Sequence, residues 1–452
     1  MQAILGILGF IFIFGLAVLF HELGHFLTAR KFGVLCHEFA IGMGPILWKK
    51  RKGETLYTIR AIPIGGYVLM GMNEGERDII KEGTEIGLTL NPEGHVEKIH
   101  VQPEEGQIVA TLASNTIDIS ADLQMAVLIE GERKVYPVDP EAWYVDSKAD
   151  RQLRIVPTNR RLEEKPKRQR FIIMASGAVM NFILAYVLVL IVGAALGEVV
   201  GISTELNMVN HEAPAYEAGI RAGDRILEID GVEITDGAMI RETIQIVGSR
   251  EMIVVLERDG VPLEVSVTPM EQQGRYVIGV DTAVYLERSL AGIFRSANAR
   301  WVDGAMMIFN SLRMLGTGEA GVGDLAGVVG IVHMTGEVAV LGILPLLIFA
   351  SIININLGIF NLLPFPALDG GHITFIVIEA IIGKPVNAKI QYAVSVVGFM
   401  LLMGLMVFTF YSDIRRIFFP PEDPPYTEEY PYSEEYPYPE EYPYLEEYPY
   451  PE

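Results

Sequence analysis

The sequence predicts a multi-pass α-helical membrane protein with four transmembrane helices, a membrane-associated β-hairpin and an extracytoplasmic α+β domain. Three observations favour this fold class. Hydrophobic residues make up 50% of the 452-residue chain, yet 20% of its residues are charged, which indicates soluble parts. Four apolar segments reach about 20 residues, the length needed to span a bilayer. Short runs rich in β-forming residues between these segments predict strands.

The apolar segments cover approximately residues 3–20, 171–196, 338–363 and 392–411. The first continues as helix to about His25, and it lacks both the positive region and the small-residue cleavage site of a signal peptide, so we predict a retained span. The predicted units are residues 1–35 (first span), 49–72 (basic loop and hairpin), 73–170 (β-rich loop), 171–196 (second span), 201–283 (α+β domain), 284–337 (amphipathic interfacial helices), 338–372 (third span), 390–412 (fourth span) and 420–452 (tail).

The positions of lysine and arginine predict the orientation of these spans. Basic clusters occupy residues 49–52 and 165–170, and Lys384 and Lys389 lie between the last two spans. Because basic residues near span ends favour the cytoplasm, all of them fall on one side if the amino terminus is extracytoplasmic. Only the pair at 415–416 opposes this arrangement. We therefore expect both termini and residues 197–337 outside, and residues 49–170 inside.

The segment His21-Glu22-Leu23-Gly24-His25 ends the first apolar run. Two histidines four residues apart share one face of a helix, so both imidazoles can reach one Zn²⁺, and Glu22 can accept a proton from the attacking water. The motif alone also occurs by chance on soluble helices. Here its ionisable groups lie in or beside a membrane span, where such groups are costly and rare unless functional. A helix simply emerging into the polar interface is the alternative.

Asp369 is the candidate third metal ligand. Catalytic zinc sites combine three protein ligands with one open position, and Asp369 is the carboxylate bordering the third span. The preceding Pro364 and Pro366 break the helix, which is tolerated at membrane depth where the backbone lines a cavity or protein interior. An ordinary helix-ending turn at Asp369-Gly370-Gly371 is the alternative, and His372 is expected near the site rather than on the metal.

Polar residues near the third span and the hairpin are candidate substrate contacts. Asn361 and Asn356 can orient a substrate carbonyl or join helices, whereas Asn181 and Asn354 are expected to join helices. Residues 55–72 read as two short β runs around Pro63 to Gly66. Such a strand edge can hold an extended substrate through main-chain bonds, although an ordinary cytoplasmic hairpin fits the pattern equally well. Its candidate contacts are Gly65, Gly66 and Tyr67.

Composition excludes other classes. A single cysteine, Cys36, excludes an intramolecular disulfide and a cysteine-rich metal site. The net charge is −22, of which −11 comes from residues 420–452, and no basic face suited to nucleic acid is indicated. That tail repeats Glu-Glu-Tyr-Pro-Tyr every six residues, a composition that predicts an extended, disordered segment.

These motifs together resemble the site-two protease family of intramembrane zinc metalloproteases (peptidase family M50), in particular the bacterial regulator of sigma-E protease type with one PDZ domain. The matching segments are HELGHFLTARKFGV (21–34), PIGGYV (63–68), Asn-Phe (181–182) and NLLPFPALDGGH (361–372). The resemblance implies His21, His25 and Asp369 as zinc ligands and Glu22 as general base. It also implies that Asn361 and the hairpin engage substrate.

Two segments depart from the family pattern, which carries Gly-Pro where this chain has Ser176-Gly177-Ala178 and Gly-Pro-Val-Gly-Ile where it has residues 327–331. Neither segment contains a ligand, so we expect effects on gating or packing rather than on the chemistry. Residues 201–283 resemble a bacterial PDZ domain, with strands at 226–229 and 253–256 and a turn at Asp230-Gly231. A peptide-binding role and a spacer role both fit this domain.

The predicted function is an intramembrane zinc endopeptidase in the bacterial cytoplasmic membrane, acting in regulated intramembrane proteolysis. Its expected partners are the lipid bilayer and single-span membrane substrates, either anti-sigma factors or signal-peptide remnants, and not nucleic acid. A catalytically silent scaffold that binds partners through the PDZ domain is the alternative. A zinc or proton transporter fits less well, because the ionisable groups gather at one depth.

Overall fold

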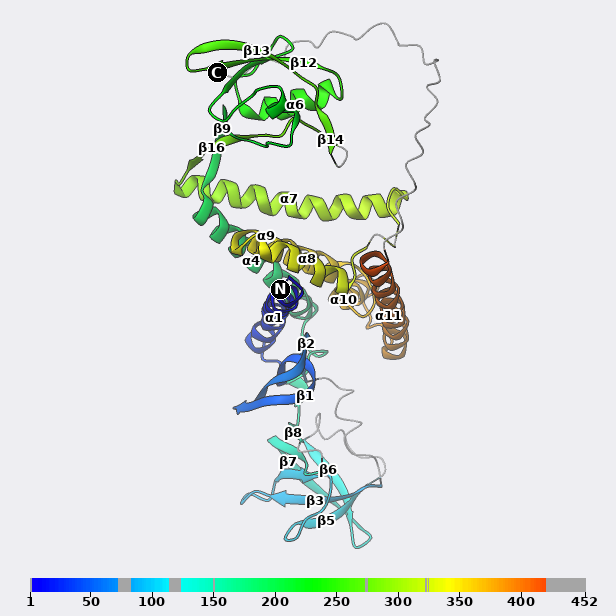
Figure 1. The fold of residues 1–452 in the computed structure, drawn as a ribbon. Helices are drawn as coiled ribbons and strands as arrows, with labels where there is room; N and C mark the ends of the chain where they lie inside the picture. Colours follow the sequence, from blue (N-terminus) through cyan, green and yellow to red (C-terminus); the bar gives the residue numbers. More distant parts are fainter. Residues whose placement is uncertain are drawn as a thin grey trace.

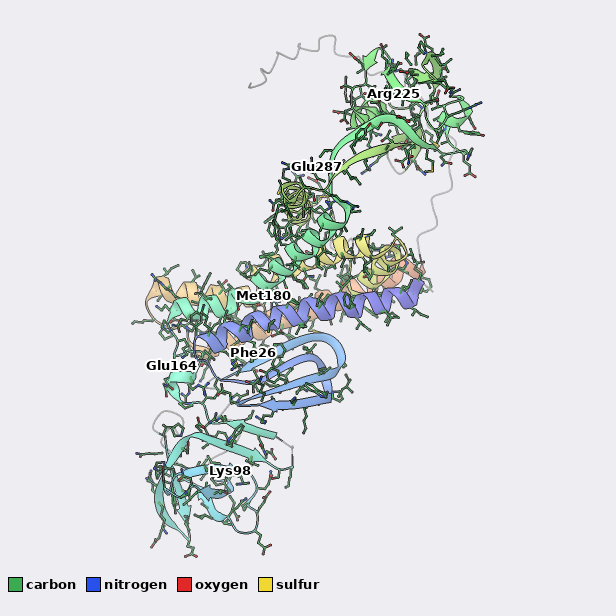
Figure 2. The ribbon with its side chains drawn as sticks, turned by 90° about the vertical axis from the view of Figure 1, so that its left-hand side faces the viewer. Phe26, Lys98, Glu164, Met180, Arg225 and Glu287 are labelled. Atoms are coloured by element: carbon green, nitrogen blue, oxygen red, sulfur yellow. The ribbon has the colours of Figure 1, made fainter. Side chains whose placement is uncertain are left out.

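The chain is extended along one axis, with apolar helices between two β-rich domains (Figure 1). The computed structural model describes residues 2–71, 83–113, 123–148, 151–272, 275–321, 323 and 325–419. One β-rich domain, which contains Lys98, lies beside the sheet that follows the first helix. The other, which contains Arg225, lies on the opposite side of the helices (Figure 2). The predicted tail at 420–452 lies outside the described residues.

Within the part of the chain that the structure describes, four helices are long and apolar enough to span a bilayer, as the sequence predicts. They are α1 (Gln2–Lys31), α4 (Lys167–Leu196), α9 (Ile343–Leu362) and α11 (Ala388–Phe418). The apolar part of each helix carries few charged residues, and large apolar side chains such as Leu8, Phe12 and Phe399 are exposed on the outer surfaces of these helices. Exposed apolar side chains are expected where a helix faces lipid, because contact between apolar surface and water is unfavourable.

The third span differs from its predicted limits of 338–372. A shorter helix, α8 (Val328–Val340), ends before it, and Gly342 with φ of 114° separates α8 from α9. At the other end, α9 stops at Leu362, since Pro364 and Pro366 cannot continue it. Asp369 therefore starts a new helix, α10 (Asp369–Ile382), instead of ending the span.

A sheet of two long strands packs against α1. Strand β1 (Cys36–Lys52) and strand β2 (Thr55–Met70) are antiparallel, and the first half of β1 pairs twice. Ala40, for example, lies opposite Thr58 and also opposite Tyr67. The first half of β1 thus has β2 on both of its sides, and residues 66–70 form an edge of the sheet.

This sheet is larger than the hairpin predicted at 55–72, because strand structure already begins at Cys36. Gly42 and Gly44 adopt φ of 83° and 81°, which bends β1 and interrupts the alternation that marks a strand in sequence. The sheet is fixed to α1 by Phe26, whose ring centroid lies 5.2 Å from that of Phe39. Burial in the same cluster raises the pKa of the Cys36 thiol to about 12, which leaves it protonated and inert.

The β-rich loop folds into a barrel. Its strands are β3 (Glu85–Leu90), β4 (Val96–His100), β5 (Ile108–Leu112), β6 (Gln124–Ile129), β7 (Glu132–Asp146) and β8 (Arg151–Arg154). The path β4-β3-β5-β6-β7 closes because β4 also pairs with β7 in parallel. The barrel contacts the β1–β2 sheet through Arg51 of β1, which stacks on the ring of Trp143 in β7 at 5.0 Å. Arg154 of β8 stacks on the same ring at 5.5 Å. The short helix η1 (Thr158–Arg160) then leads to α4.

The second β-rich domain is an α+β unit. It comprises β9 (Glu198–Val209), α5 (Pro214–Glu217), β10 (Arg225–Ile229), β11 (Val232–Glu233), α6 (Gly237–Val247), β12 (Met252–Arg258), β13 (Val261–Val267), β14 (Met270–Gln272), β15 (Arg275–Val277) and β16 (Val280–Glu287). The main sheet has the order β13-β12-β10-β9-β16. Asp230 and Gly231 both have positive φ, as a two-residue hairpin turn requires, so the predicted turn is present. The helix α7 (Leu290–Thr317) follows (Figure 1).

Asp413 of α11 fastens that helix to α8. The side chain is fully buried, and its oxygens accept hydrogen bonds from the backbone N–H of Gly327 (3.2 Å) and Gly330 (2.7 Å) at the start of α8. Arg416 pairs with the same carboxylate at 3.2 Å. A carboxylate suits this place because it satisfies unpaired donors at a helix start and complements the helix dipole.

We expect Asp413→Leu to lower the free energy of unfolding by about 1–3 kcal/mol, because two buried donors lose their acceptor. Arg416→Gln is the matched control. Its side chain is half exposed, and a pair of that kind contributes about 0–1 kcal/mol. Unfolding midpoints measured in one detergent test both variants. Equal midpoints for Asp413→Leu and wild type would contradict the assignment.

Candidate metal centre

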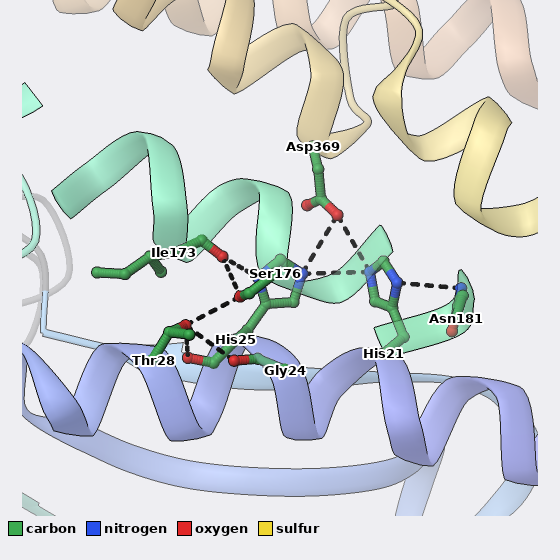
Figure 3. Close-up of polar contacts among 8 residues, drawn as sticks. All are labelled: His21, Gly24, His25, Thr28, Ile173, Ser176, Asn181 and Asp369. Carbon is green, nitrogen blue, oxygen red and sulfur yellow. Dashed lines mark hydrogen bonds and ion pairs between the residues drawn. The ribbon is translucent and has the colours of Figure 1, made fainter. Parts of the chain in front are cut away.

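Helix α1 carries the two candidate histidine ligands on one face. His21 and His25 are separated by about one turn, and their Nε2 atoms lie 3.2 Å apart (Figure 3). His25 is buried, with 6% of its surface exposed, and the His21 side chain is 14% exposed. The rings are thus shielded from solvent while both Nε2 atoms point toward the same place.

Asp369, the first residue of α10, brings the third donor to the histidines. Its Oδ2 lies 3.1 Å from Nε2 of His21 and 3.2 Å from Nε2 of His25. The next two residues must be glycine. A Cβ on Gly370 would lie 1.9 Å from the carbonyl oxygen of Leu363, and a Cβ on Gly371 would lie 2.6 Å from that of Phe365. The turn after α9 therefore folds tightly over the start of α10 and places Asp369 at the site.

The three donors fit zinc. Zinc bonds of about 2.0–2.2 Å at tetrahedral angles place ligand atoms about 3.3–3.6 Å apart. The three separations here agree within a few tenths of an ångström, and among the described residues these three side chains form a group suited to a metal ion. Two imidazoles and one carboxylate are also a ligand set that zinc favours.

Helix α4 orients His25 and packs closely on α1. The backbone carbonyl of Ile173 lies 2.8 Å from Nδ1 of His25. A proton on Nδ1 donates to this carbonyl and leaves the Nε2 lone pair for a metal. The hydroxyls of Thr28 and Ser176 lie 2.9 Å apart and join the two helices beside this contact (Figure 3).

Glycine at position 177 makes this approach possible. A Cβ there would lie 2.4 Å from Nε2 of His25 and 2.8 Å from Nε2 of His21. On the facing helix, a Cβ on Gly24 would lie 2.3 Å from the carbonyl oxygen of Ser176. The expectation that residues 176–178 affect gating or packing rather than chemistry stays a prediction, and the backbone of Gly177 packs against both histidines. A sequence pattern does not reveal this contact, since it depends on how two distant helices cross.

A cavity of about 860 Å³ opens beside the three donors. Glu22 lines it, and the backbone of Val68 in β2 lies close to the Glu22 carboxylate. Gly66 and Tyr67 line the same wall, and a Cβ on Gly66 would lie 3.0 Å from Cγ of Glu22. The opposite wall is formed by α10 and the first turns of α11. The edge of the β1–β2 sheet, the Glu22 side chain and the candidate metal ligands therefore line the same cavity.

The other predicted contacts lie elsewhere. Gly65 has φ of 76° and sits at the bend before the edge segment, where a Cβ would lie 3.0 Å from Cε of Met43. Asn356 and Asn361 are half-buried on α9 and are not among the described residues that line the cavity. Their contact with a substrate stays a prediction. His372 does line the cavity, as a neighbour of the site.

Sequence reasoning missed an ion pair at the cavity wall. Arg170 at the start of α4 pairs with Glu379 on α10, and both side chains are largely buried and line the cavity. Lys167 also donates to the backbone carbonyl of Glu379 at 3.1 Å. The basic run at 165–170 was interpreted only as an orientation signal, and nothing local in the sequence links it to a glutamate about 200 residues away.

The family model and the curated relatives agree on one family. Residues 9–405 match the family described as Peptidase family M50. The regulator of sigma-W protease RasP of Bacillus subtilis is 37% identical over 419 residues, which cover 91% of this chain and 99% of that protein. The zinc metalloprotease RasP of Shouchella clausii is 36% identical over the same shares of the two chains. A PDZ domain of the SdrC-like protein from Listeria monocytogenes is 19% identical over 18% of this chain and 87% of its own, with a TM-score of 0.17.

Proposed function

Because the chain belongs to peptidase family M50 and is a zinc metalloprotease, we propose that it cleaves single-span membrane proteins within or near their transmembrane segments. One observation carries this proposal. His21, His25 and Asp369 converge beside Glu22 on a cavity lined by apolar helices and by the edge of the β1–β2 sheet. Such a site is accessible to a chain that is itself in the membrane.

The residues around the site have distinct roles. His21, His25 and Asp369 would hold the metal, and a zinc ion bound there would polarise a carbonyl and acidify water. Glu22 accepts the proton of the attacking water and passes it to the amide nitrogen of the leaving chain. The Glu22 carboxylate lies close to the backbone of Val68, beside the β2 edge where the scissile bond is to lie.

The substrate binds as an added strand. Gly66 and Val68 lie at the edge of the β1–β2 sheet, and both line the cavity together with Tyr67. Main-chain hydrogen bonds to such an edge hold a peptide extended whatever its side chains. Gly66 lets that peptide approach Glu22 closely. Asn361 and Asn356 are further candidates for orienting the substrate carbonyl.

Residues 49–170 lie in the cytoplasm, and both termini and residues 197–337 lie outside, in a bacterial cytoplasmic membrane. The basic runs at 49–52 and 165–170 support this orientation. So does the position of the barrel and the α+β domain on opposite sides of the helices (Figure 1). The site then lies near the cytoplasmic leaflet. We assign residues 201–283 as an extracytoplasmic PDZ domain that meets the substrate outside.

Anti-sigma factors and signal-peptide remnants are the proposed substrates. The Bacillus subtilis relative is named as a regulator of sigma-W, which suits control through an anti-sigma factor. Both substrate types place one apolar span in the bilayer, and both lack a bulky outer domain once a first protease has acted. A substrate of that shape can pass the outer α+β domain and reach the cavity.

The test is cleavage of a single-span anti-sigma-type protein, with its outer domain removed, by the purified full-length enzyme in detergent. We expect one cut within or beside the span, located by mass spectrometry. The zinc chelator 1,10-phenanthroline should stop cleavage, and added Zn²⁺ should restore it. The same protein with its outer domain intact is the matched control, expected to react much more slowly. Cleavage that persists in the chelator, or cuts only in water-exposed loops, would overturn the proposal.

A further inference from the structure

We propose that Asn181 is a positioning residue that holds His21 in the tautomer whose Nε2 is free to bind metal. The proposal rests on the metal site described above and assigns a further residue to it. A histidine that binds metal through Nε2 keeps its proton on Nδ1, and that proton needs an acceptor. For His25 the acceptor is the Ile173 carbonyl at 2.8 Å. His21 requires a counterpart.

Asn181 stands at the required place. Its side-chain amide lies against Nδ1 of His21, with Nδ2 at 3.4 Å (Figure 3). The residue is fully buried, and its Oδ1 has no hydrogen-bond partner among the described residues. A half turn of the amide leaves the shape of the side chain unchanged and brings Oδ1 onto the Nδ1 proton. That orientation gives both the ring proton and the unpaired oxygen a partner.

The position of Asn181 on α4 supports this role. Gly177 is the point where α4 meets both imidazoles, and Asn181 follows it by four residues, hence on the same face of the helix. The carbonyl of Ile173 lies one turn before Gly177. One helix therefore supplies the orienting groups for both histidines, one from its backbone and one from a side chain.

The sequence interpretation was that Asn181 joins helices. Asn181 does join two helices, and its partner is a candidate metal ligand, His21 on α1. Asn354, for which the same role is expected, is also buried, at 1% exposure, but its amide donates to the carbonyl of Ala350 in its own helix at 2.8 Å. Asn354 is therefore a matched control for the same substitution.

The experiment compares zinc affinity in full-length Asn181→Leu, Asn181→Asp, Asn354→Leu and wild-type protein, by competition with a chromophoric chelator in detergent. Asn181→Leu should bind zinc about 10- to 100-fold more weakly, the usual effect of losing a group that orients a ligand. Asn354→Leu should bind as wild type does. Asn181→Asp offers acceptors only, so it should retain or improve on wild-type affinity. The absorption of bound Co²⁺ should change in Asn181→Leu and not in Asn354→Leu.

Three results would overturn the inference: wild-type zinc affinity in Asn181→Leu, equal losses in both leucine variants, or loss of affinity in Asn181→Asp. The aspartate variant keeps the test decisive if the leucine variant does not fold. Failure of the metal site itself is distinguishable, because Asp369→Ala would then bind zinc as well as wild type does. With the site intact and Asn181→Leu unaffected, only the role of Asn181 fails.

Discussion

Gly177→Ala is expected to abolish zinc binding and proteolysis together. The added methyl would lie 2.4 Å from Nε2 of His25 and 2.6 Å from Cε1 of His21, closer than any real side-chain contact. Neither helix can yield, since a Cβ on Gly24 would already lie 2.3 Å from the carbonyl oxygen of Ser176. The rings must move, so zinc affinity should fall by more than the about 10- to 100-fold that follows loss of an orienting group.

Metal content of the purified variant, measured by mass spectrometry, and substrate cleavage check this result. Gly15→Ala is the matched control. Gly15 lies on α1, the helix that carries both histidines, and a Cβ there would meet nothing within 4 Å. It should keep its zinc and its activity. A Gly177→Ala protein with a full complement of zinc and normal cleavage would show that the two helices separate more easily than their contacts indicate.

Glu22→Gln is expected to lower the rate of cleavage by about 10²- to 10⁴-fold, the range for loss of a general acid–base. The amide keeps the shape of the carboxylate but cannot accept the proton of water. Since Glu22 is not one of the three convergent donors, zinc should stay bound. Retained metal with lost activity is the signature that separates Glu22 from His21, His25 and Asp369.

Single-turnover cleavage and metal content, measured on the same preparation, check the second prediction. Glu164→Gln is its control, as Glu164 is exposed at the cavity wall, far in sequence from the metal motif. This change should affect the rate much less. Equal rates for wild type and Glu22→Gln would show that another group takes the proton.

The parts of the site that sequence reasoning predicted are those that depend on local geometry. The four-residue spacing of His21 and His25 needs only the helical period, and Asp369 is marked by the prolines and glycines around it. Long-range geometry was not predictable. The approach of Gly177 to the ligands and the place of Asn181 depend on how α4 crosses α1, and no residue pattern within either helix records that crossing.

The fold, like the site, was predictable where it depends on local sequence and not where it depends on long-range contacts. The spans are evident from their apolar length, and the strands expected at 226–229 and 253–256 are present within β10 and β12. The closure of the barrel was not predictable, since parallel pairing of β4 with β7 joins segments about 40 residues apart. The start of β1 was not predictable because Gly42 and Gly44 bend the strand. The division of the predicted third span into α8 and α9 was not predictable because it occurs at a single residue, Gly342.

The proposed binding of substrate along the sheet edge at residues 66–70 has an energetic consequence for selectivity. A transmembrane helix in lipid already satisfies all of its backbone groups, and each one left unpaired costs several kcal/mol. A chain that reaches the edge has to exchange helical hydrogen bonds for strand hydrogen bonds almost one for one. The enzyme can therefore discriminate among spans by the free energy of that exchange. Spans rich in glycine, or in β-branched residues that lower helix propensity, would react before uniformly leucine-rich ones.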